Sequence, residues 1–585
     1  MALEDVERRS AGLGDLPGTV SPSPQGLVLG LFGVWCWLAS RRLNILFYVV
    51  LLLIVTLEVW AAPHRIHRWA HDTWIFLDGG WRVLNGQRPY VDFFTGLGPV
   101  TFLLVALGLR ISGGAAAGID YGFATAALLS GVWAWRLSKP RIESPTAFLV
   151  AIFVALFVIS PHAIGSRADM LTYASIYNRL AYALVAIVLV EAMCPFRARQ
   201  AASGFAGGVS SGAACALLIF VKPSFFLVAI LIAAGSFLFP DHRGLRRFLG
   251  MLAGLAAISL AMSAYLRFDI GAVWYSLKTV GAARVQSQSG DPRMDVGLFP
   301  FFKHAYDKIG NLAGLMFLAL LVSLLPGRAR LHRYFDPWWI LAAAFAVCIV
   351  ETLFLMTNGT QTSVPLVAVF ALLLASRIYT WWQAASLDDR HRHGLICGIG
   401  LIFALVLFLP DMVGDFSSLL YSSALSVAGR QLPGRFNSPP LRSLMTRETP
   451  ADWEEPDSGK SYVDLINDGI DLLERSSAPA ESVFTLDYVN PFSYALQRTP
   501  APGGAAYLGG SIFNPRHMPS MEWMLGRADL VMVPKQPAQP GLARWLDGIF
   551  GQFLRDRFSL AAESPSWQMY RRQVQPHAGL PLVDR

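Results

Sequence analysis

Residues 71–99 read HDTWIFLDGGWRVLNGQRPYVDFFTGLGP, a polar stretch between two apolar segments of the chain. Its large apolar residues recur at intervals of three and four, which is the spacing of one helix face. They are Trp74, Leu77, Trp81 and Leu84. Gly86 and Pro89 interrupt this period. The stretch therefore predicts a short helix with a Trp-rich apolar face in the membrane interface, then a turn, then re-entry into lipid at about Gly98.

Three carboxylates fall within the same stretch, Asp72, Asp78 and Asp92. For any one of them, a solvated position on a loop is as good an interpretation as a functional one. Three acids on one loop beside the membrane favour an active site. Asp78 precedes two glycines and could brace the loop, while Asp92 lies in a turn, where Asp commonly bonds to backbone. Asp72 comes first after the preceding apolar segment and is the leading candidate.

Composition places the chain in a membrane. Of its 585 residues, 54% are hydrophobic and 15% are charged, whereas soluble domains carry about one quarter charged residues. The mean hydropathy is +0.44. The net charge of +8 comes from Lys and Arg in short clusters between apolar segments, which is typical of topology signals. A nucleic-acid-binding face would need a contiguous basic surface, so no nucleic-acid partner is expected.

Two further patterns are missing from the sequence. The five cysteines lie in apolar runs without CxxC or Cys/His spacing, so neither a disulfide framework nor a zinc site is expected. Residues 1–30 contain no apolar core followed by a small-residue cleavage site, so we expect no cleaved signal peptide.

Residues 43–62 are apolar over a length that spans a bilayer, which needs about 20 residues. Arg41 and Arg42 precede them and predict a cytoplasmic tail, residues 1–42, in which 27–39 form an interfacial helix. Further spans are predicted at 99–113, 117–135, 146–160, 178–194, 203–221, 225–240, 247–266, 308–326, 337–357, 363–381 and 394–412. The fold class is thus an all-α polytopic membrane protein, with about 12 or 13 transmembrane helices over residues 43–413.

Basic clusters test this topology, because loops rich in Lys and Arg stay in the cytoplasm. The clusters are 136–141, 196–199, 241–247, 327–333 and 388–393. From the second cluster onward they alternate correctly with the spans. The first does not, because two complete spans after an outward loop at 63–98 would place it outside. Either one short segment within 99–135 fails to cross, or this cluster violates the charge rule; the sequence leaves both interpretations open.

A second outward loop is predicted at 268–309, a long polar segment between two spans. Its basic residues are Lys278, Arg284, Arg293, Lys303 and His304. A cationic loop beside lipid can hold the phosphate of a donor. Solvated charges on a linker are an equally good interpretation.

Other ionisable residues lie at or inside predicted spans. Arg167 and Arg179 flank the start of the span at 178–194, where they are interface anchors or substrate contacts. Lys222 is expected at a hairpin between two short segments. Glu351 lies in an apolar run, where an ionised carboxylate costs about 2.5 to 3.5 kcal/mol. It is therefore expected to be paired, protonated or beside a water-filled cavity, and a functional role is favoured.

Residues 414–585 contain no apolar run long enough to span and are rich in turn dipeptides. Strand-like runs at 482–489 and 530–535 alternate with helical segments such as the one that begins at Tyr462. The sequence predicts a soluble mixed α/β domain that recognises the acceptor or covers the site. Span alternation places this domain outside.

One span, a large outward loop with an early acid, about a dozen spans and a C-terminal soluble domain together resemble the GT-C superfamily of integral-membrane glycosyltransferases. The pattern D-x-W-x-x-L-D-G-G … G-x-x-P-Y-x-D-F … G-x-G-P at 72–99 resembles the first loop of one bacterial branch. This branch is related to protein O-mannosyltransferases, the lipid A aminoarabinose transferase and rhizobial lipopolysaccharide galacturonosyltransferases. The architectural similarity covers 43–413, and YNRLAYAL at 177–184 adds a weaker motif.

The resemblance implies a catalytic base on the first loop, and by position Asp72 takes that role. Many members carry paired acids here, whereas this chain has Asp72-Thr73. The resemblance also implies a polyprenyl-phosphate sugar as donor. The acceptor would be a glycolipid, lipopolysaccharide, polysaccharide or protein on the outer face of a bacterial inner membrane.

Chemistry agrees with this assignment. The leaving phosphate needs charge stabilisation more than protonation, whereas the acceptor hydroxyl needs a base. Basic side chains would act as an electrostatic clamp, and direct displacement would invert the anomeric carbon. A divalent cation held by Asp72 with Asp78 or Asp92 could replace the clamp, but no ligand spacing compels a metal. Two alternatives are a transporter or flippase for lipid-linked saccharides, although no internal repeat is found, and an inactive scaffold.

Overall fold

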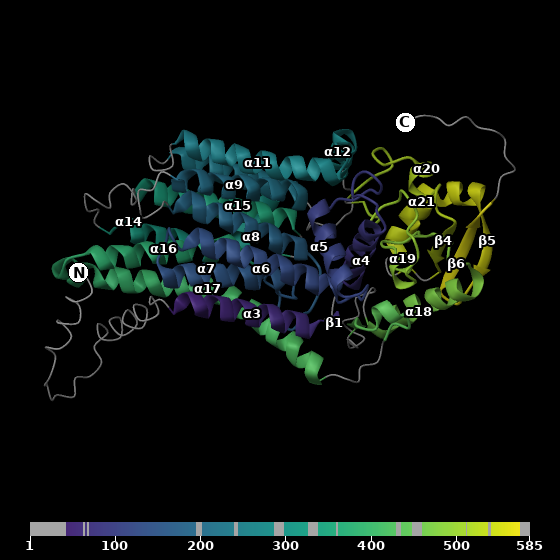
Figure 1. Cartoon of the computed structure of the whole chain (residues 1–585), viewed down its shortest axis with the longest axis horizontal. Coiled ribbons are helices and arrows are strands. Elements are labelled where there is room, and N and C mark those ends of the chain that lie inside the picture. Colours follow the sequence, from purple (N-terminus) through teal and green to yellow (C-terminus); the bar gives the residue numbers. More distant parts are fainter. Residues whose placement is uncertain are drawn as a thin grey trace.

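In the computed structural model, the described residues are 42–62, 65–66, 69–194, 202–238, 244–285, 298–325, 337–358, 361–428, 435–446, 459–510, 512–535, 537 and 540–573. They form a helical bundle that is joined at one end to a small α/β domain (Figure 1). The interfacial helix expected at 27–39 and the candidate Arg293 lie outside the described residues.

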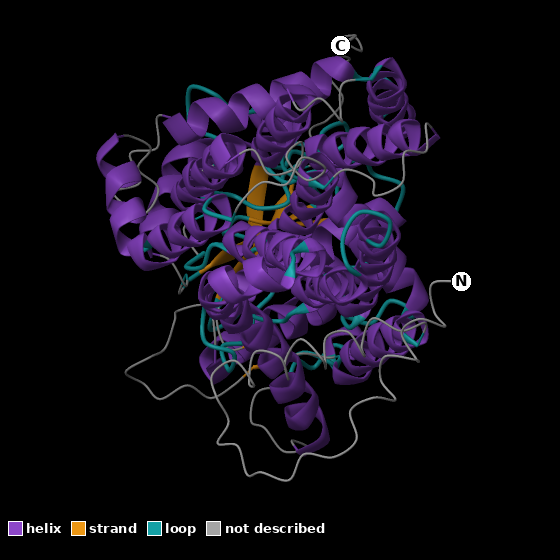
Figure 2. Cartoon of the chain, turned by 90° about the vertical axis from the view of Figure 1, so that its left-hand side faces the viewer, coloured by secondary structure: helices purple, strands orange, loops and turns teal. Residues whose placement is uncertain are grey.

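Every segment predicted to span the membrane contains a helix. The bundle comprises α3 (Leu43–Ala61), α6 (Gly118–Ser138), α7 (Ser144–Ile159), α8 (Ile176–Met193), α9 (Ala202–Val221), α10 (Pro223–Gly235), α11 (Leu245–Tyr265), α14 (Ile309–Ser323), α15 (Pro337–Thr357), α16 (Pro365–Ala384) and α17 (Leu387–Ala428). Seven helices of the described part are long and apolar enough to cross a membrane: α3, α8, α9, α11, α15, α16 and α17. The bent pair of α13 (Leu298–Asp307) and α14 would make an eighth span. The shorter apolar helices α7 and α10, together with α6, pack among them. Figure 2 shows the helices packed side by side, seen from the end of the molecule away from the C-terminal domain.

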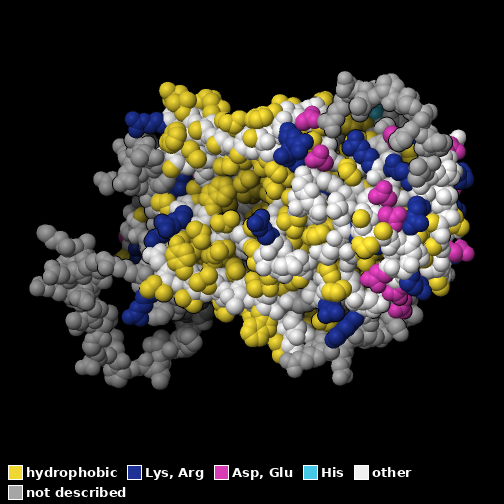
Figure 3. Space-filling view, turned by 45° about the vertical axis from the view of Figure 1, so that its right-hand side comes forward, with side chains coloured by type: hydrophobic (Ala, Val, Ile, Leu, Met, Phe, Trp, Pro, Cys, Tyr) yellow, Lys and Arg dark blue, Asp and Glu magenta, His cyan; other side chains and the backbone are white. Residues whose placement is uncertain are grey.

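The sides of the bundle are apolar. Large hydrophobic side chains are exposed along its outer helices, such as Ile45 and Leu52 of α3, Leu252 of α11 and Phe345 of α15. Water would solvate such an extensive apolar surface poorly, whereas a bilayer solvates it well. Figure 3 shows hydrophobic side chains covering the bundle and acidic side chains gathered over the C-terminal domain. The chain is a multi-pass membrane protein.

The helix α5 (Pro99–Ile111) starts and ends at the same end of the bundle. At its start, the Gly98 amide donates to the Val221 carbonyl at 3.2 Å. Just after its end, the Tyr494 hydroxyl of the C-terminal domain donates to the Gly114 carbonyl at 2.7 Å. With 13 residues, α5 is also shorter than the roughly 20 that a bilayer needs. The structure therefore supports the interpretation that one short segment within 99–135 fails to cross.

Helix ends next to the basic clusters meet at the opposite end of the bundle. Lys139, after α6, donates to Asn44 at the start of α3 (2.7 Å). Arg247 of α11 donates through Nε to Glu191 of α8 (3.0 Å). Because α5 does not cross, alternation of the remaining helices assigns the described helix ends next to the five basic clusters to this end, away from the C-terminal domain. The cluster at 136–141 then obeys the charge rule.

The C-terminal domain is mixed α/β, as predicted. Its four-stranded sheet has the order β3-β4-β6-β5, with β3 and β4 parallel and the other pairs antiparallel. The strands are β3 (Val483–Thr485), β4 (Leu530–Pro534), β5 (Phe558–Glu563) and β6 (Trp567–Arg572), and the long helices are α18 (Gly459–Ser476) and α21 (Pro540–Arg557). Sequence reasoning located β3, β4 and α18 but missed the hairpin of β5 and β6. A short parallel pair of β1 (Arg65–Ile66) and β2 (Met445–Thr446) ties the first loop to this part of the chain.

Two segments differ from expectation. The boundary placed at 413/414 falls inside α17, which continues through Pro410 to Ala428. The segment 268–309 is largely helical rather than a loop, since it contains α12 (Ile270–Val285) and α13. Apolar residues of α12 pack against Tyr90 and Leu266, which explains why this polar segment folds back onto the first loop.

Candidate active site

The first loop contains the predicted helix, α4 (Ala70–Leu84), which lies at the end of the bundle between α5 and the C-terminal domain (Figure 1). Trp74 packs edge-on against Phe436, with ring centroids 5.5 Å apart, and Trp81 packs edge-on against Tyr494 at 6.1 Å. The Trp81 indole N–H donates to the Arg498 carbonyl at 2.8 Å. The Trp-rich face expected in the membrane interface instead packs against the C-terminal part of the chain. The expected environment of this face was wrong, because helical periodicity indicates that a face is buried but does not distinguish burial in lipid from burial against protein.

Two glycines in the middle of α4 allow α5 to approach. A Cβ on Gly79 would lie 2.2 Å from the Phe102 ring, and one on Gly80 would lie 2.6 Å from Val105. Real Cβ atoms do not come so close to other atoms, so larger residues would push the two helices apart. The Gly-Gly pair thus fixes the position of α4 over the bundle.

Asp72 occupies the first turn of α4. Its side chain keeps 21% of its surface exposed, and His71 Nε2 lies 3.5 Å from Asp72 Oδ1. Burial raises the pKa of Asp72 to about 7. Burial also lowers the pKa of His71 to about 3, so the ring is neutral near pH 7 and the contact is not an ion pair. A carboxyl with a pKa near the working pH can accept a proton and then release it.

The direction of the Asp72 side chain follows from Phe76, which lies one helical turn later in α4. Residues four apart share a helix face, so Asp72 and Phe76 lie on one side of α4. The Phe76 ring is 6.5 Å from the ring of Tyr177 at the start of α8. Asp72 therefore belongs to the face of α4 that is turned toward the helix ends of the bundle.

The C-terminal domain contributes a second acid that sequence reasoning missed. Burial raises the pKa of Asp487, just after β3, to about 6. The adjacent Tyr488 packs edge-on against His71 at 4.6 Å and lies 5.7 Å from Tyr507. Acids with raised pKa values thus come from both sides of the joint between α4 and this domain. The sequence feature that could have identified Asp487 is an acid within a strand-like run.

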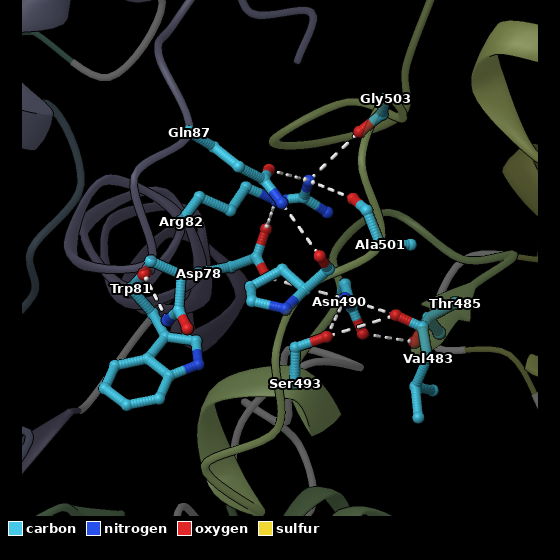
Figure 4. A network of polar contacts seen from close by, with 12 residues as sticks. Asp78, Trp81, Arg82, Gln87, Val483, Thr485, Asn490, Ser493, Ala501 and Gly503 are labelled. Atoms are coloured by element: carbon cyan, nitrogen blue, oxygen red, sulfur yellow. Dashed lines mark hydrogen bonds and ion pairs between the residues drawn. The ribbon is translucent and has the colours of Figure 1, made fainter. Parts of the chain in front are cut away.

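Asp78 belongs to a buried network that joins α4 to the C-terminal domain (Figure 4). Its Oδ2 accepts from Arg82 Nε at 2.7 Å, and both side chains are fully buried. Arg82 Nη1 donates to three oxygens, each at 3.0 Å: Oε1 of Gln87 and the carbonyls of Ala501 and Gly503. Burial raises the pKa of Asp78, and Arg82 opposes that rise. This geometry fits the bracing role that the sequence left open for Asp78.

Asp92 lies beyond the far end of α4. Its Oδ2 accepts from the Arg88 amide at 2.8 Å, as expected of an Asp in a turn, and its carbonyl accepts from the Gly503 amide at 2.8 Å. From Asp72 to the last residue of α4, the helix rises about 18 Å. The three acids of the first loop are therefore not brought together, and a divalent cation held by Asp72 with Asp78 or Asp92 is not supported. No group of three or more His, Cys, Asp or Glu suited to a metal occurs among the described residues.

The basic candidates of 268–309 are divided between two helices. Lys278 is exposed on α12, which packs against the first loop. Lys303 is exposed and His304 half-buried on α13, which packs against α14 and α15. The side chain of Arg284, like Arg293, lies outside the described residues.

The remaining candidates have structural partners. Arg167 forms an exposed pair with Asp169 at 2.9 Å. Arg179 is buried and donates to Asp415 of α17 at 2.8 Å. Glu351 is buried and accepts from the Tyr182 hydroxyl at 3.0 Å, as well as from a backbone amide at the start of α16. Arg179 and Glu351 therefore hold helices together.

No protein-family model matches the chain, and neither does any curated protein. Solved structures with a similar course of the chain include ArnT from Cupriavidus metallidurans bound to undecaprenyl phosphate, with 10% identity, a TM-score of 0.44 and coverage of 92% of this chain and 100% of the other. Another is the oligosaccharyltransferase AglB from Archaeoglobus fulgidus in complex with an inhibitory peptide and a dolichol-phosphate (14%, TM-score 0.35, coverage 93% and 76%). A third is the arabinofuranosyltransferase AftD from Mycobacteria (14%, TM-score 0.36, coverage 92% and 40%).

Proposed function

We propose that this chain is a GT-C-type membrane glycosyltransferase. It transfers a sugar from a polyprenyl-phosphate donor to a glycolipid, lipopolysaccharide, polysaccharide or protein of the cell envelope. The first loop and the C-terminal domain face outward from a bacterial inner membrane, and the basic clusters face the cytoplasm. Support comes from the loop pattern at 72–99 and from the bundle topology, in which the acid-bearing loop and the C-terminal domain share one end.

The observation that carries the proposal is the position of Asp72. It lies on the face of α4 turned toward the helix ends, and burial raises its pKa to about 7. A base in that position can take a proton from an acceptor hydroxyl held between the bundle and the C-terminal domain. General-base catalysis of this kind contributes typically about 100- to 10,000-fold.

The reaction is a single displacement at the anomeric carbon. The acceptor oxygen forms a bond to this carbon while the bond from the carbon to the phosphate oxygen breaks. The bonding pair leaves with the polyprenyl phosphate, and the acceptor proton passes to Asp72. The configuration inverts because the oxygen enters opposite the leaving phosphate. We expect Asp487 and Tyr488 to contact the acceptor, because Tyr488 packs against His71, the neighbour of the base.

Transfer of radiolabelled sugar from a polyprenyl-phosphate sugar to envelope fractions, in membranes that contain or lack this chain, tests the proposal. Label appearing in an acceptor only when the chain is present supports a glycosyltransferase. Movement of the sugar lipid across the membrane without transfer would support the flippase instead. Mass spectrometry of the glycans lost from a deletion strain would identify the acceptor.

A further inference from the structure

His71 lies between the proposed base and the C-terminal domain. Its Nε2 is 3.5 Å from Asp72 Oδ1, and its ring packs edge-on against the ring of Tyr488, with centroids 4.6 Å apart. The side chain of His71 keeps 13% of its surface exposed. The imidazole therefore lies against the carboxyl of the base and against a tyrosine that comes from a distant part of the chain.

Tyr488 is held in place by the C-terminal domain. Its carbonyl accepts from the Leu508 amide at 2.7 Å, and its own amide donates to Asp487 Oδ1 at 2.8 Å. Its ring lies 5.7 Å from the ring of Tyr507, which is buried. The position of the His71 ring thus depends on how the C-terminal domain packs over α4.

The His71 ring can donate a hydrogen bond, but it does not take a proton from the base. Burial lowers the pKa of His71 to about 3, so the ring stays neutral at the pH where Asp72, with a pKa of about 7, titrates. A neutral imidazole carries one N–H, and the tautomer with this proton on Nε2 directs it at Asp72 Oδ1. Such a donor favours the ionised carboxylate and leaves Oδ2 for the acceptor hydroxyl.

The start of α4 also favours charge on Asp72. His71 and Asp72 are the second and third residues of this helix, and N–H groups of a first helical turn attract negative charge. The N-cap residue Trp69 has a φ of 52°, in the left-handed region that an aromatic residue rarely adopts. Backbone of this kind persists where the surroundings fix it, and it is found mostly at functional sites.

The separation of Nε2 and Oδ1 is slightly longer than the roughly 2.7 to 3.2 Å of most N–H···O hydrogen bonds. A small shift of the ring toward Asp72 completes the bond, and catalytic hydrogen bonds commonly tighten in this way when a substrate binds. Tyr488 packs on this ring and is also the residue that we expect to contact the acceptor. Binding of the acceptor against Tyr488 would therefore act on the His71 ring.

We propose that His71 is a positioning residue, which orients Asp72 and favours its ionised form, and that Tyr488 couples it to acceptor binding. This inference rests on the proposed function. The acceptor proton passes to Asp72 Oδ2, while His71 keeps the proton on Nε2. The proton on Asp72 then passes to water after the glycosylated product leaves, so the base returns to its ionised form.

Other titratable or charged groups face the pair from the elements around it. Among the described side chains they are Asp487 with Tyr462 of α18 on the C-terminal side, and Tyr177 of α8 with Lys222 on the bundle side. The basic side chains of 64–68 lie outside the described residues. A test must therefore show that an effect of His71 acts through Asp72, and variants in an Asp72→Asn background do so.

The pH dependence of kcat/KM tests the proposal in the purified full-length protein, with the radiolabelled polyprenyl-phosphate sugar and envelope fraction that give transfer in membranes. His71→Phe keeps a ring against Tyr488 but removes the donor, so the pKa of the base should rise. The break near pH 7 should move upward by about one pH unit, with kcat/KM about tenfold lower at pH 6 and near the wild-type value at high pH. His71→Gln, whose amide can donate, should keep the break near pH 7.

His517→Phe is the matched control, because His517 is a half-buried histidine whose ring contacts Asn514 of its own loop. It should leave both the break and the rate unchanged. An unmoved break in His71→Phe, or an equal loss of rate at every pH as a purely structural role would give, would overturn the proposal. If His71→Phe does not elute as a monodisperse protein, His71→Leu, which also lacks a donor, takes its place.

Thermal unfolding in detergent gives a readout that needs no turnover. Because the pKa of Asp72 is raised in the folded state, stability falls as the pH rises through that pKa. Between pH 7 and pH 8.5 the His71 ring is largely neutral in the folded and unfolded chain alike, so this window reports Asp72. The fall should extend about one pH unit higher in His71→Phe than in the wild type. It should not change when His71→Phe is added to Asp72→Asn, and an extension that survives there would refute the coupling.

The two assays separate this inference from the proposed function. Asp72-dependent transfer with a wild-type pH profile in His71→Phe would refute the role of His71 and leave the glycosyltransferase standing. A stability shift that depends on both His71 and Asp72, in a chain without detectable transfer, would support their interaction and refute the proposed reaction.

Discussion

At the scale of residues, the two acids of α4 have different tasks. Asp72 keeps part of its surface accessible, whereas Asp78 is fully buried in an ion pair with Arg82. Asp72→Asn keeps the shape and removes the base, so turnover should fall by about 100-fold or more with unchanged protein level. Asp92→Asn, at the far end of α4, should keep near-normal turnover. Steady-state transfer assays on matched amounts of purified variants check this, and a normal rate in Asp72→Asn would assign the base elsewhere.

The raised pKa of Asp72 predicts the pH dependence. Ionised Asp72 is the active form, so kcat/KM should rise about tenfold per pH unit up to about pH 7 and then level off. The stability of the fold should instead fall as the pH rises. Because burial raises the pKa of Asp72 from 3.8, the folded state favours the protonated carboxyl. Its full contribution to the free energy of unfolding is present below about pH 4 and is lost as the pH rises through 7.

Asp72→Asn should therefore flatten the pH profile of the residual rate and weaken the loss of thermal stability between pH 5 and pH 8. Asp487→Asn is the comparison, because the pKa of Asp487 is raised only to about 6. A break near pH 7 that survives in Asp72→Asn would contradict the assignment.

Sequence reasoning could single out Asp72 because the pattern is local: an acid that follows an apolar span can be recognised from neighbouring residues alone. It could not find Asp487 as a neighbour, since 415 positions separate the two acids along the chain. Nor could it assign Arg179 to Asp415, because a pairing between α8 and α17 depends on how the helices pack.

At the scale of elements, the network of Asp78 and Arg82 holds α4 against the C-terminal domain. Arg82→Met would leave the Asp78 carboxylate buried without its cation, and breaking a buried pair in this way costs about 3 to 5 kcal/mol. Unfolding temperature in detergent should fall, and limited proteolysis should release the C-terminal domain faster. Arg167→Met is the control, because the exposed pair with Asp169 contributes about 0 to 1 kcal/mol. Equal effects of the two substitutions would refute the bracing role.

Gly98 sets the junction of the first loop with α5. A Cβ there would lie 2.0 Å from the Phe220 carbonyl oxygen, which is backbone and cannot rotate away. Gly98→Ala should therefore displace α5 and lower the unfolding temperature and the yield of monodisperse protein. Gly235, at the end of α10, meets no atom within 4 Å, so Gly235→Ala should be neutral or slightly stabilising. Comparable losses in both variants would show that the close contact at Gly98 is unimportant.

At the scale of the whole molecule, hydropathy predicted the helices better than it predicted the membrane crossings. Each predicted span contains a helix because a long apolar run must satisfy its backbone N–H and C=O groups within the segment, whether it crosses the membrane or not. Whether α5 crosses depends on where its ends attach, at Val221 and Tyr494, and these contacts are long-range. The basic clusters contained the missing information, since the misfit at 136–141 indicated one span too many.

This topology makes a final prediction, which single cysteines can test in intact spheroplasts with an impermeant thiol reagent. Four native cysteines are buried, and Cys36, outside the described residues, is first replaced by serine. Asn85→Cys in the first loop and Arg527→Cys in the C-terminal domain should both react, because each position is exposed at the outer end. Lys139→Cys, at the cytoplasmic end, should react only after permeabilisation. Arg110→Cys decides the span count: it should react with the outer pair if α5 returns to its own side, and protection of this position in intact spheroplasts would mean that α5 crosses the membrane.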